Sequence, residues 1–75
     1  MMEKQIALTA ILEKEDELYV SFCPELDIAS QGETKEEARA NLVEALELFF
    51  ETASETEIER RLKSGREVST VLVQV

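Results

Sequence analysis

Histidine and tryptophan are absent from the chain, and cysteine and proline occur once each. Without histidine, no unperturbed side chain changes its charge near neutral pH, which leaves carboxylates and one thiol as candidate catalytic groups. A single cysteine cannot form an internal disulfide. No apolar run approaches the roughly 20 residues that cross a bilayer, and residues 1–5 lack the pattern of a signal peptide. We therefore expect a cytoplasmic protein without membrane contact.

Charge of one sign dominates what is present. The chain has 17 acidic and 8 basic residues, for a net charge of −9. Such a surface repels phosphate backbones, so direct binding to DNA or RNA is not expected. It suits the encounter with a basic protein partner. The alternative is that the charge only keeps a small protein soluble.

The size of the chain predicts one domain, residues 1–75. Hydrophobic residues make up 44% of its 75 residues, which excludes a disordered chain. A domain this small buries only about 60% of the surface that its unfolded chain exposes. We therefore expect partners to add to its stability.

Alternating apolar residues predict two strands joined by a charged turn. The first strand, residues 5–13, directs one strongly apolar face to the core, made of Ile6, Leu8, Ala10 and Leu12. Residues 14–17 are all charged and predict a four-residue hairpin loop. The second strand, residues 18–23, is half-buried and alternates at Leu18, Val20 and Phe22.

A third strand and two helices follow. Pro24 ends the second strand, and residues 26–31 return beside it as the third strand of an antiparallel meander. Capping boxes at Thr34 and Ser54 predict the starts of a long and a short helix, and Gly65 predicts the stop of the second. The apolar stripe of the long helix should cover one face of the sheet; it consists of Ala38, Leu42, Ala45, Leu46, Phe49 and Ala53, widened by Val43 and Phe50.

The short helix should direct Ile58 and Leu62 inward. On its surface we expect the ion pairs Glu57–Arg61 and Glu59–Lys63, which have the favourable spacing of four residues.

Residues 68–75 predict a final strand that is β-branched and apolar on both faces. A right-handed connection places it parallel to the first and third strands, beside the first. The fold class is therefore α+β, with the order β-β-β-α-(α)-β. Because an uncovered apolar edge strand promotes aggregation, we expect self-association through Val71, Val73 and Val75, with a homodimer as the commonest closed assembly.

Residues 5 to 51 resemble the N-terminal domain of HicB-like antitoxins. The resemblance rests on four groups of residues: Cys23-Pro24-Glu25-Leu26-Asp27, Ser30-Gln31-Gly32, Thr34-Lys35-Glu36-Glu37-Ala38 and Asn41-Leu42-x-Glu44-Ala45-Leu46. It implies a type II antitoxin that binds a small basic RNA-cleaving toxin of the HicA type, and a fold that is part of a ribonuclease H-like domain. Members of that family often continue into a DNA-binding module, which would begin at about Val75.

Two groups of acidic residues are candidates for contact with a basic partner. Glu25 and Asp27 lie near the proline turn, and Glu44, Glu47 and Glu51 share one face of the long helix. Their alternatives are loop acids and an ordinary solvated helix face. Tyr19 is a further candidate, as an aromatic anchor.

Catalysis is not expected. Cys23 has no histidine to activate it and is interpreted as a packing residue. Glu25, Asp27 and Glu37 could begin a magnesium site, and the ribonuclease H-like resemblance makes a nuclease a third hypothesis. A strongly negative surface disfavours it, and no pattern indicates a cofactor. A stand-alone homo-oligomeric module without a toxin is the second hypothesis.

Overall fold

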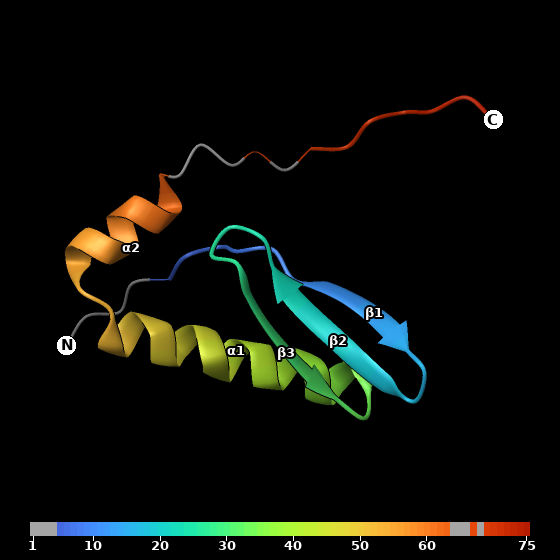
Figure 1. The fold of residues 1–75 in the computed structure, drawn as a ribbon, viewed down its shortest axis with the longest axis horizontal. Helices are drawn as coiled ribbons and strands as arrows, with labels where there is room; N and C mark the ends of the chain where they lie inside the picture. Colours follow the sequence, from blue (N-terminus) through green and yellow to red (C-terminus); the bar gives the residue numbers. More distant parts are fainter. Residues whose placement is uncertain (1–4, 64–66, 68) are drawn as a thin grey trace.

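Three antiparallel strands followed by two helices make up the computed structural model, which describes residues 5–63, 67 and 69–75 (Figure 1). The elements are β1 (Ile11–Glu15), β2 (Leu18–Cys23), β3 (Ile28–Gly32), α1 (Lys35–Thr52) and α2 (Glu55–Leu62). This confirms an α+β fold with a meander ahead of the helices. No helix in the described part of the chain is long and apolar enough to cross a membrane.

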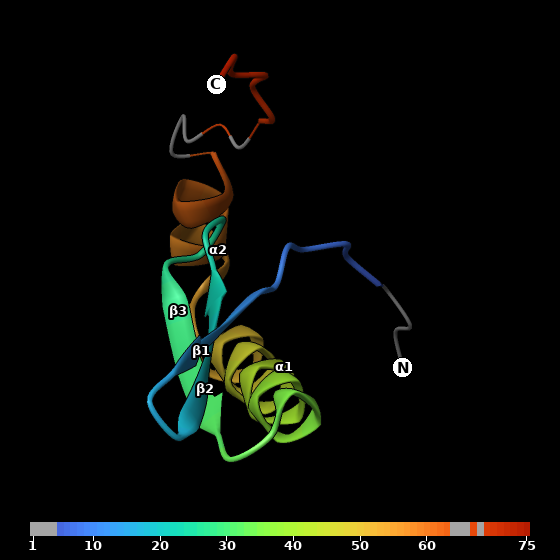
Figure 2. The same cartoon turned by 90° about the vertical axis from the view of Figure 1, so that its right-hand side faces the viewer.

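The sheet has the order β1-β2-β3, and α1 lies across one of its faces (Figure 2). The β1–β2 turn is shorter than the sequence predicts, because Lys14 and Glu15 belong to β1 and Glu15 pairs with Leu18. Asp16 occupies this turn with a φ of 55°. The left-handed conformation is one that a short polar side chain tolerates.

The face of β2 that meets α1 is the less hydrophobic one. Ser21 and Cys23 are fully buried, and the Ser21 hydroxyl donates a 2.9 Å hydrogen bond to the carbonyl oxygen of Ala38. Because side chains alternate along a strand, the apolar alternation of Leu18, Val20 and Phe22 lies on the opposite face. Small residues face the helix because they let its backbone approach the sheet closely.

We call the face opposite α1 the outer face. On this face, Phe22 of β2 pairs with Ile11 of β1 and with Ala29 of β3, and Leu18 of β2 pairs with Glu15 of β1. Ile11 is 40% exposed. No helix or strand of the described residues covers this face (Figure 2).

The predicted first strand is wrong in its first half, because β1 begins only at Ile11. Continuing the register that pairs Ile11 with Phe22 would bring Ala10 opposite Cys23 and Thr9 opposite Pro24. β2 ends at Cys23, and a proline has no N–H to donate to a ladder. Residues 5–10 lie outside the three strands of the described residues.

Both helix starts are confirmed. The Thr34 side chain accepts from the backbone N–H of Glu37 at 3.0 Å, and Ser54 does the same for Glu57 at 3.1 Å. Each bond satisfies one of the free N–H groups of a first helical turn. The Glu37 carboxylate in turn accepts from the backbone N–H of Glu33.

The core is formed by α1, β2 and the loop before β3. Its buried members are Cys23, Leu26 and Leu42, against which Leu8, Ile28, Leu46, Phe49 and Phe50 pack. Val43 is 47% exposed and does not widen the apolar stripe of α1, contrary to the prediction.

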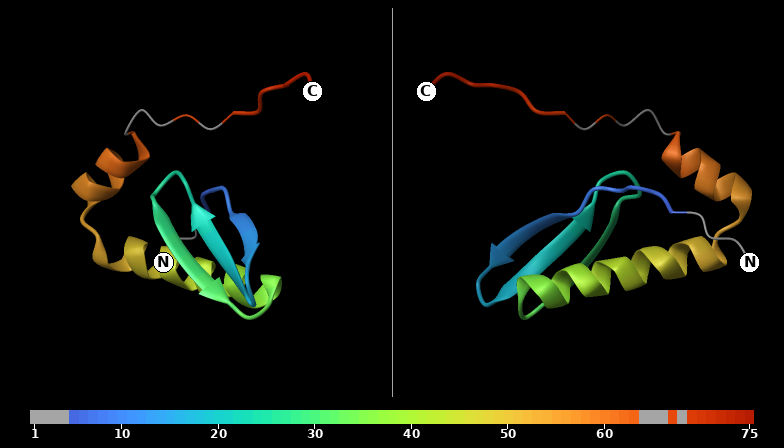
Figure 3. Two further views of the ribbon diagram at one scale, coloured as in Figure 1. Left: turned by 45° about the vertical axis from the view of Figure 1, so that its right-hand side comes forward. Right: turned by 180° about the vertical axis from the view of Figure 1, so that it is seen from behind.

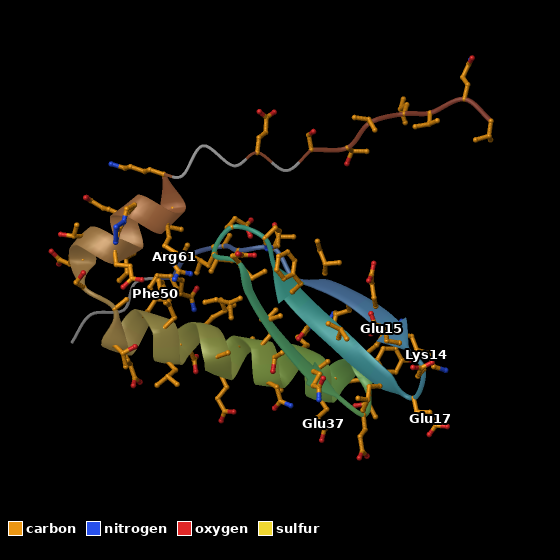
Figure 4. All side chains as sticks on the ribbon, in the orientation of Figure 1. Lys14, Glu15, Glu17, Glu37, Phe50 and Arg61 are labelled. Carbon is orange, nitrogen blue, oxygen red and sulfur yellow. The ribbon has the colours of Figure 1, made fainter. Side chains whose placement is uncertain are left out.

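Arg61 links α2 to the rest of the domain, and no residue of α2 is buried. Arg61 donates a 2.8 Å hydrogen bond to the carbonyl oxygen of Leu26, and its guanidinium lies 5.1 Å from the ring centroid of Phe49. Figure 4 shows Arg61 directed toward the end of α1 that carries Phe50. The predicted ion pair with Glu57 is present at 3.4 Å.

Two further predictions for α2 are wrong. Leu62 is 41% exposed, and among the described ion pairs there is none between Glu59 and Lys63.

The final strand is absent from the described residues. Residues 69–75 lie outside any helix or strand and apart from the sheet (Figure 3). The predicted pairing beside the first strand is therefore wrong within this chain. Gly65 and Val68, which belong to the predicted helix stop and strand start, lie outside the described residues.

Gly32 provides a test of the close approach between sheet and helix. A Cβ at Gly32 would lie 2.6 Å from the Ala38 nitrogen and 2.9 Å from the Glu37 carbonyl carbon, both backbone atoms. Gly32→Ala should lower the free energy of unfolding by about 1–3 kcal/mol, as overpacking does, measured by urea denaturation. The control Ala29→Ser, on the outer face, should change it by less than about 0.5 kcal/mol. Equal stability of Gly32→Ala and the unmutated chain would contradict this packing.

Arg61→Gln should release α2. The hydrogen bond from the Arg61 guanidinium to the Leu26 carbonyl contributes about 1 kcal/mol. Without it, α2 amides should exchange with solvent about fivefold faster. NMR-detected hydrogen exchange measures this, and amides of α1 around Leu42 should be unaffected. The control Glu57→Gln removes only a half-buried ion pair that remains partly open to solvent, worth little, and should leave exchange unchanged. The same acceleration in both variants would show that the ion pair is the link.

Candidate functional site

Three glutamates of α1 gather around one hollow on the surface. We call it the acidic groove; it is lined by Ser30, Asn41, Glu44, Ala45, Glu47, Leu48 and Glu51. The three glutamates are exposed, and Leu48 is 58% exposed, so apolar and acidic surface lie together. The helical spacing predicted that these glutamates share a face, and the structure brings them to one site.

Asn41 connects the acidic groove to the edge of the sheet. Its side-chain nitrogen donates a 2.8 Å hydrogen bond to the carbonyl oxygen of Gln31 in β3. Ser30 and Ala45 are small, which leaves the hollow between β3 and α1 open. The acidic groove therefore lies between β3 and α1, which the Asn41–Gln31 hydrogen bond links.

Asn41 belongs to the residues that carry the family resemblance, but the sequence did not indicate its contact with a strand, because an asparagine inside a helix is not tied to one kind of partner. Only the tertiary contact shows its role.

Glu25 does not lie beside the groove glutamates. Its carboxylate accepts from the backbone N–H of Thr9 at 3.0 and 3.2 Å and from the Thr9 hydroxyl at 2.6 Å. The Cys23 thiol also donates to it, at 3.4 Å. Glu25 is half-buried, and it holds the segment 5–10 onto the loop in place of a strand partner.

Asp27 lies in the same loop but is exposed. Its φ is 59°, and its backbone N–H donates a 2.8 Å hydrogen bond to the carbonyl oxygen of Cys23. Asp27 therefore braces its loop through its backbone. Of the two predicted loop acids, only Asp27 presents its carboxylate to solvent.

The environment of Glu25 and Cys23 shifts the pKa of each. The hydrogen bonds from Thr9 lower the pKa of the Glu25 carboxyl, outweighing partial burial. Burial raises the pKa of the Cys23 thiol, with Glu25 adding to the effect. Cys23 therefore stays a protonated, buried thiol near neutral pH, as a packing residue would.

The described residues bring no three histidine, cysteine, aspartate or glutamate side chains together as a metal site would. Glu37 lies at the start of α1, where its carboxylate is engaged by the Glu33 backbone. The geometry thus offers no cluster on which a metal-dependent reaction could be built from these residues.

The remaining candidates lie elsewhere. Tyr19 is half-buried and pairs with Gly32, on the side of β2 that faces α1. Val71, Val73 and Val75 are exposed in the segment 69–75, which lies apart from α1 and β3 (Figure 1).

Comparison with known proteins finds one informative similarity. No family model matches the chain, and no solved structure matches it. The chain is 52% identical over 46 residues to UPF0150 protein ssr1765 of Synechocystis sp. (strain ATCC 27184 / PCC 6803 / Kazusa), a match that covers 59% of this chain and 58% of that protein. The chain thus spans well under two thirds of that relative, whose name states no activity.

Glu25 should make stability depend on pH. Because its pKa is lower in the folded chain than its ordinary value of 4.5, its contribution is present above pH 4.5 and is lost as pH falls through the folded-state pKa. Glu25→Gln should therefore be less stable at neutral pH and lose less stability on acidification. Urea denaturation at a series of pH values measures this.

The matched control is Glu13→Gln, an exposed glutamate of β1. It should keep the acid dependence of the unmutated chain. If Glu25→Gln and the unmutated chain lose stability in parallel below pH 4.5, the bond to Thr9 does not stabilise the fold.

Proposed function

We propose that the chain is a HicB-like antitoxin that binds a small basic RNA-cleaving toxin and blocks it sterically. The acidic groove is the contact surface, and the chain performs no chemistry of its own. No cofactor takes part. The toxin is inactive while its positively charged RNA-binding surface is covered.

The observation that carries this proposal is the grouping of Glu44, Glu47 and Glu51 around a hollow. Like charges at this spacing repel each other on an isolated helix, and a basic partner relieves that repulsion. Leu48 supplies apolar contact between them. The net charge of −9 adds long-range attraction, which speeds the encounter of oppositely charged proteins.

The resemblance of residues 5 to 51 to HicB-like antitoxins supports the same proposal. The residues that carry it include Glu44 and Asn41, both of which line the acidic groove. Asp27, exposed in the loop, is a second contact for the basic partner. Glu25 is assigned a structural role instead, because its carboxylate is engaged by Thr9.

A second candidate function is a stand-alone homo-oligomeric binding module without a toxin. The exposed apolar segment 69–75 favours it, since such a segment favours contact with another chain. Under this alternative the groove glutamates form an ordinary solvated helix face.

Co-purification from the natural host separates the two. The tagged chain, isolated at low salt and weighed by intact-protein mass spectrometry, should bring with it a small basic protein that high salt releases. That protein, expressed alone, should arrest growth. Recovery of the chain only with copies of itself would support the stand-alone module and overturn the antitoxin proposal.

Replacing Glu44, Glu47 and Glu51 together by glutamine should weaken binding of that companion at least about tenfold, or about 1.4 kcal/mol. The matched control replaces Glu13 of β1 together with Glu15 and Glu17, which lie at the β1–β2 turn (Figure 4); all three are exposed. Both triple variants lose three negative charges, but only the first loses side chains that line the acidic groove. Calorimetry of both variants provides the comparison, and equal weakening would show that net charge, not the groove, determines binding.

A further inference from the structure

The two edges of the sheet differ in charge. β2 is central, so β1 and β3 are the edge strands (Figure 3). β1 carries the charged residues Glu13, Lys14 and Glu15, and charged side chains protect an edge strand against pairing with another chain. β3 has the sequence Ile-Ala-Ser-Gln-Gly and contains no charged side chain. The edge at β3 therefore lacks the protection that the edge at β1 has.

The backbone of β3 directs hydrogen-bonding groups away from the sheet. Along an antiparallel edge strand, the N–H and C=O groups of successive residues point alternately toward the neighbouring strand and away from it. The carbonyl oxygen of Gln31 accepts from Asn41 of α1, so Gln31 is a residue that points away from β2, and by alternation so is Ala29. Both residues are exposed. In the described part of the chain, nothing bonds to the Ala29 backbone on this side or to the Gln31 N–H.

The acidic groove lies beside the same edge. Ser30, between Ala29 and Gln31, lines the groove together with residues of α1. A strand added to β3 would direct every second side chain to the α1 side of the sheet, toward the groove. Such side chains are about 6.7 Å apart, and one turn of a helix advances about 5.4 Å. Cationic side chains at alternate positions therefore have nearly the spacing of Glu47 and Glu51, which lie on successive turns of α1.

We propose that the basic partner adds an extended segment to β3 as a further strand, with lysine or arginine at alternate positions directed into the acidic groove. This inference rests on the proposed function and names the part of the partner that occupies the groove. Backbone hydrogen bonds to Ala29 and Gln31 hold the segment, and its alternate side chains provide specificity. The segment 69–75 of a second copy contains no lysine or arginine, so it does not match the groove glutamates.

The first test uses two synthetic peptides of equal composition and charge, Val-Lys-Val-Lys-Val-Lys-Val and Lys-Lys-Lys-Val-Val-Val-Val. Only the first has lysine at alternate positions. In an NMR titration of the labelled chain, the alternating peptide should bind at least about tenfold more tightly than the other. It should also slow the solvent exchange of the Ala29 and Gln31 amides. Equal binding of the two peptides, no binding of the first at millimolar concentration, or protection of the Lys14 amide at the other edge instead would overturn the proposal.

The second test removes one backbone donor from the open edge. Proline is tolerated in an edge strand where the N–H faces solvent, so Ala29→Pro should remain folded, which circular dichroism checks. Ala29→Pro should bind the alternating peptide at least about tenfold more weakly. The matched control Ala29→Ser keeps the N–H and should bind the peptide as the unmutated chain does. Equal affinity of the two folded variants would contradict strand addition at β3.

The same variants, tested with the co-purifying companion, separate this proposal from the antitoxin function. If replacing the groove glutamates weakens binding of the companion and Ala29→Pro does not, the companion fills the groove without adding a strand, and only this proposal is wrong. If no companion exists while the alternating peptide binds at β3, the antitoxin function is wrong and the edge is still a site for a basic strand. Protection of the Ala29 amide in the chain alone, increasing with concentration, would show that a second copy occupies the edge and would overturn this proposal.

Discussion

The close approach between the start of α1 and the sheet is the constraint on which the rest of the structure depends. Three small residues permit it: Ser21, Gly32 and Ala38. The Ser21 hydroxyl donates to the Ala38 carbonyl at 2.9 Å, and the Ala38 nitrogen lies 2.6 Å from the position that a Cβ of Gly32 would take. A larger side chain at any of these positions would push α1 off the sheet, and Cys23 and Leu42 would lose their contact in the core.

This constraint determines which surfaces remain for other molecules. With Ala38 and Leu42 facing the sheet, helical spacing turns Glu44, Glu47 and Glu51 toward solvent around the acidic groove. Because α1 covers one face only, no helix or strand of the described residues covers the outer face (Figure 2).

Local signals predicted much of the fold, whereas contacts distant in sequence were missed. A capping threonine, Thr34, correctly marked the start of α1, because its hydrogen bond forms within four residues. In β2, hydrophobic alternation predicted the wrong face for the core. Ser21 faces α1, where its hydroxyl bonds to Ala38, 17 positions away. The effect of Pro24 on β1, and the engagement of Glu25 by Thr9, depend on register across a hairpin. The groove glutamates were predicted as one face, but the hollow between them required the placement of β3.

The central claim is that the chain silences a basic RNA-cleaving protein by covering it. The most direct measurement is cleavage of an RNA substrate by the co-purifying companion, titrated with increasing amounts of this chain. The account predicts that cleavage falls in proportion to the added chain and stops at a fixed molar ratio, while added salt restores it. Undiminished cleavage at excess chain would contradict the claim.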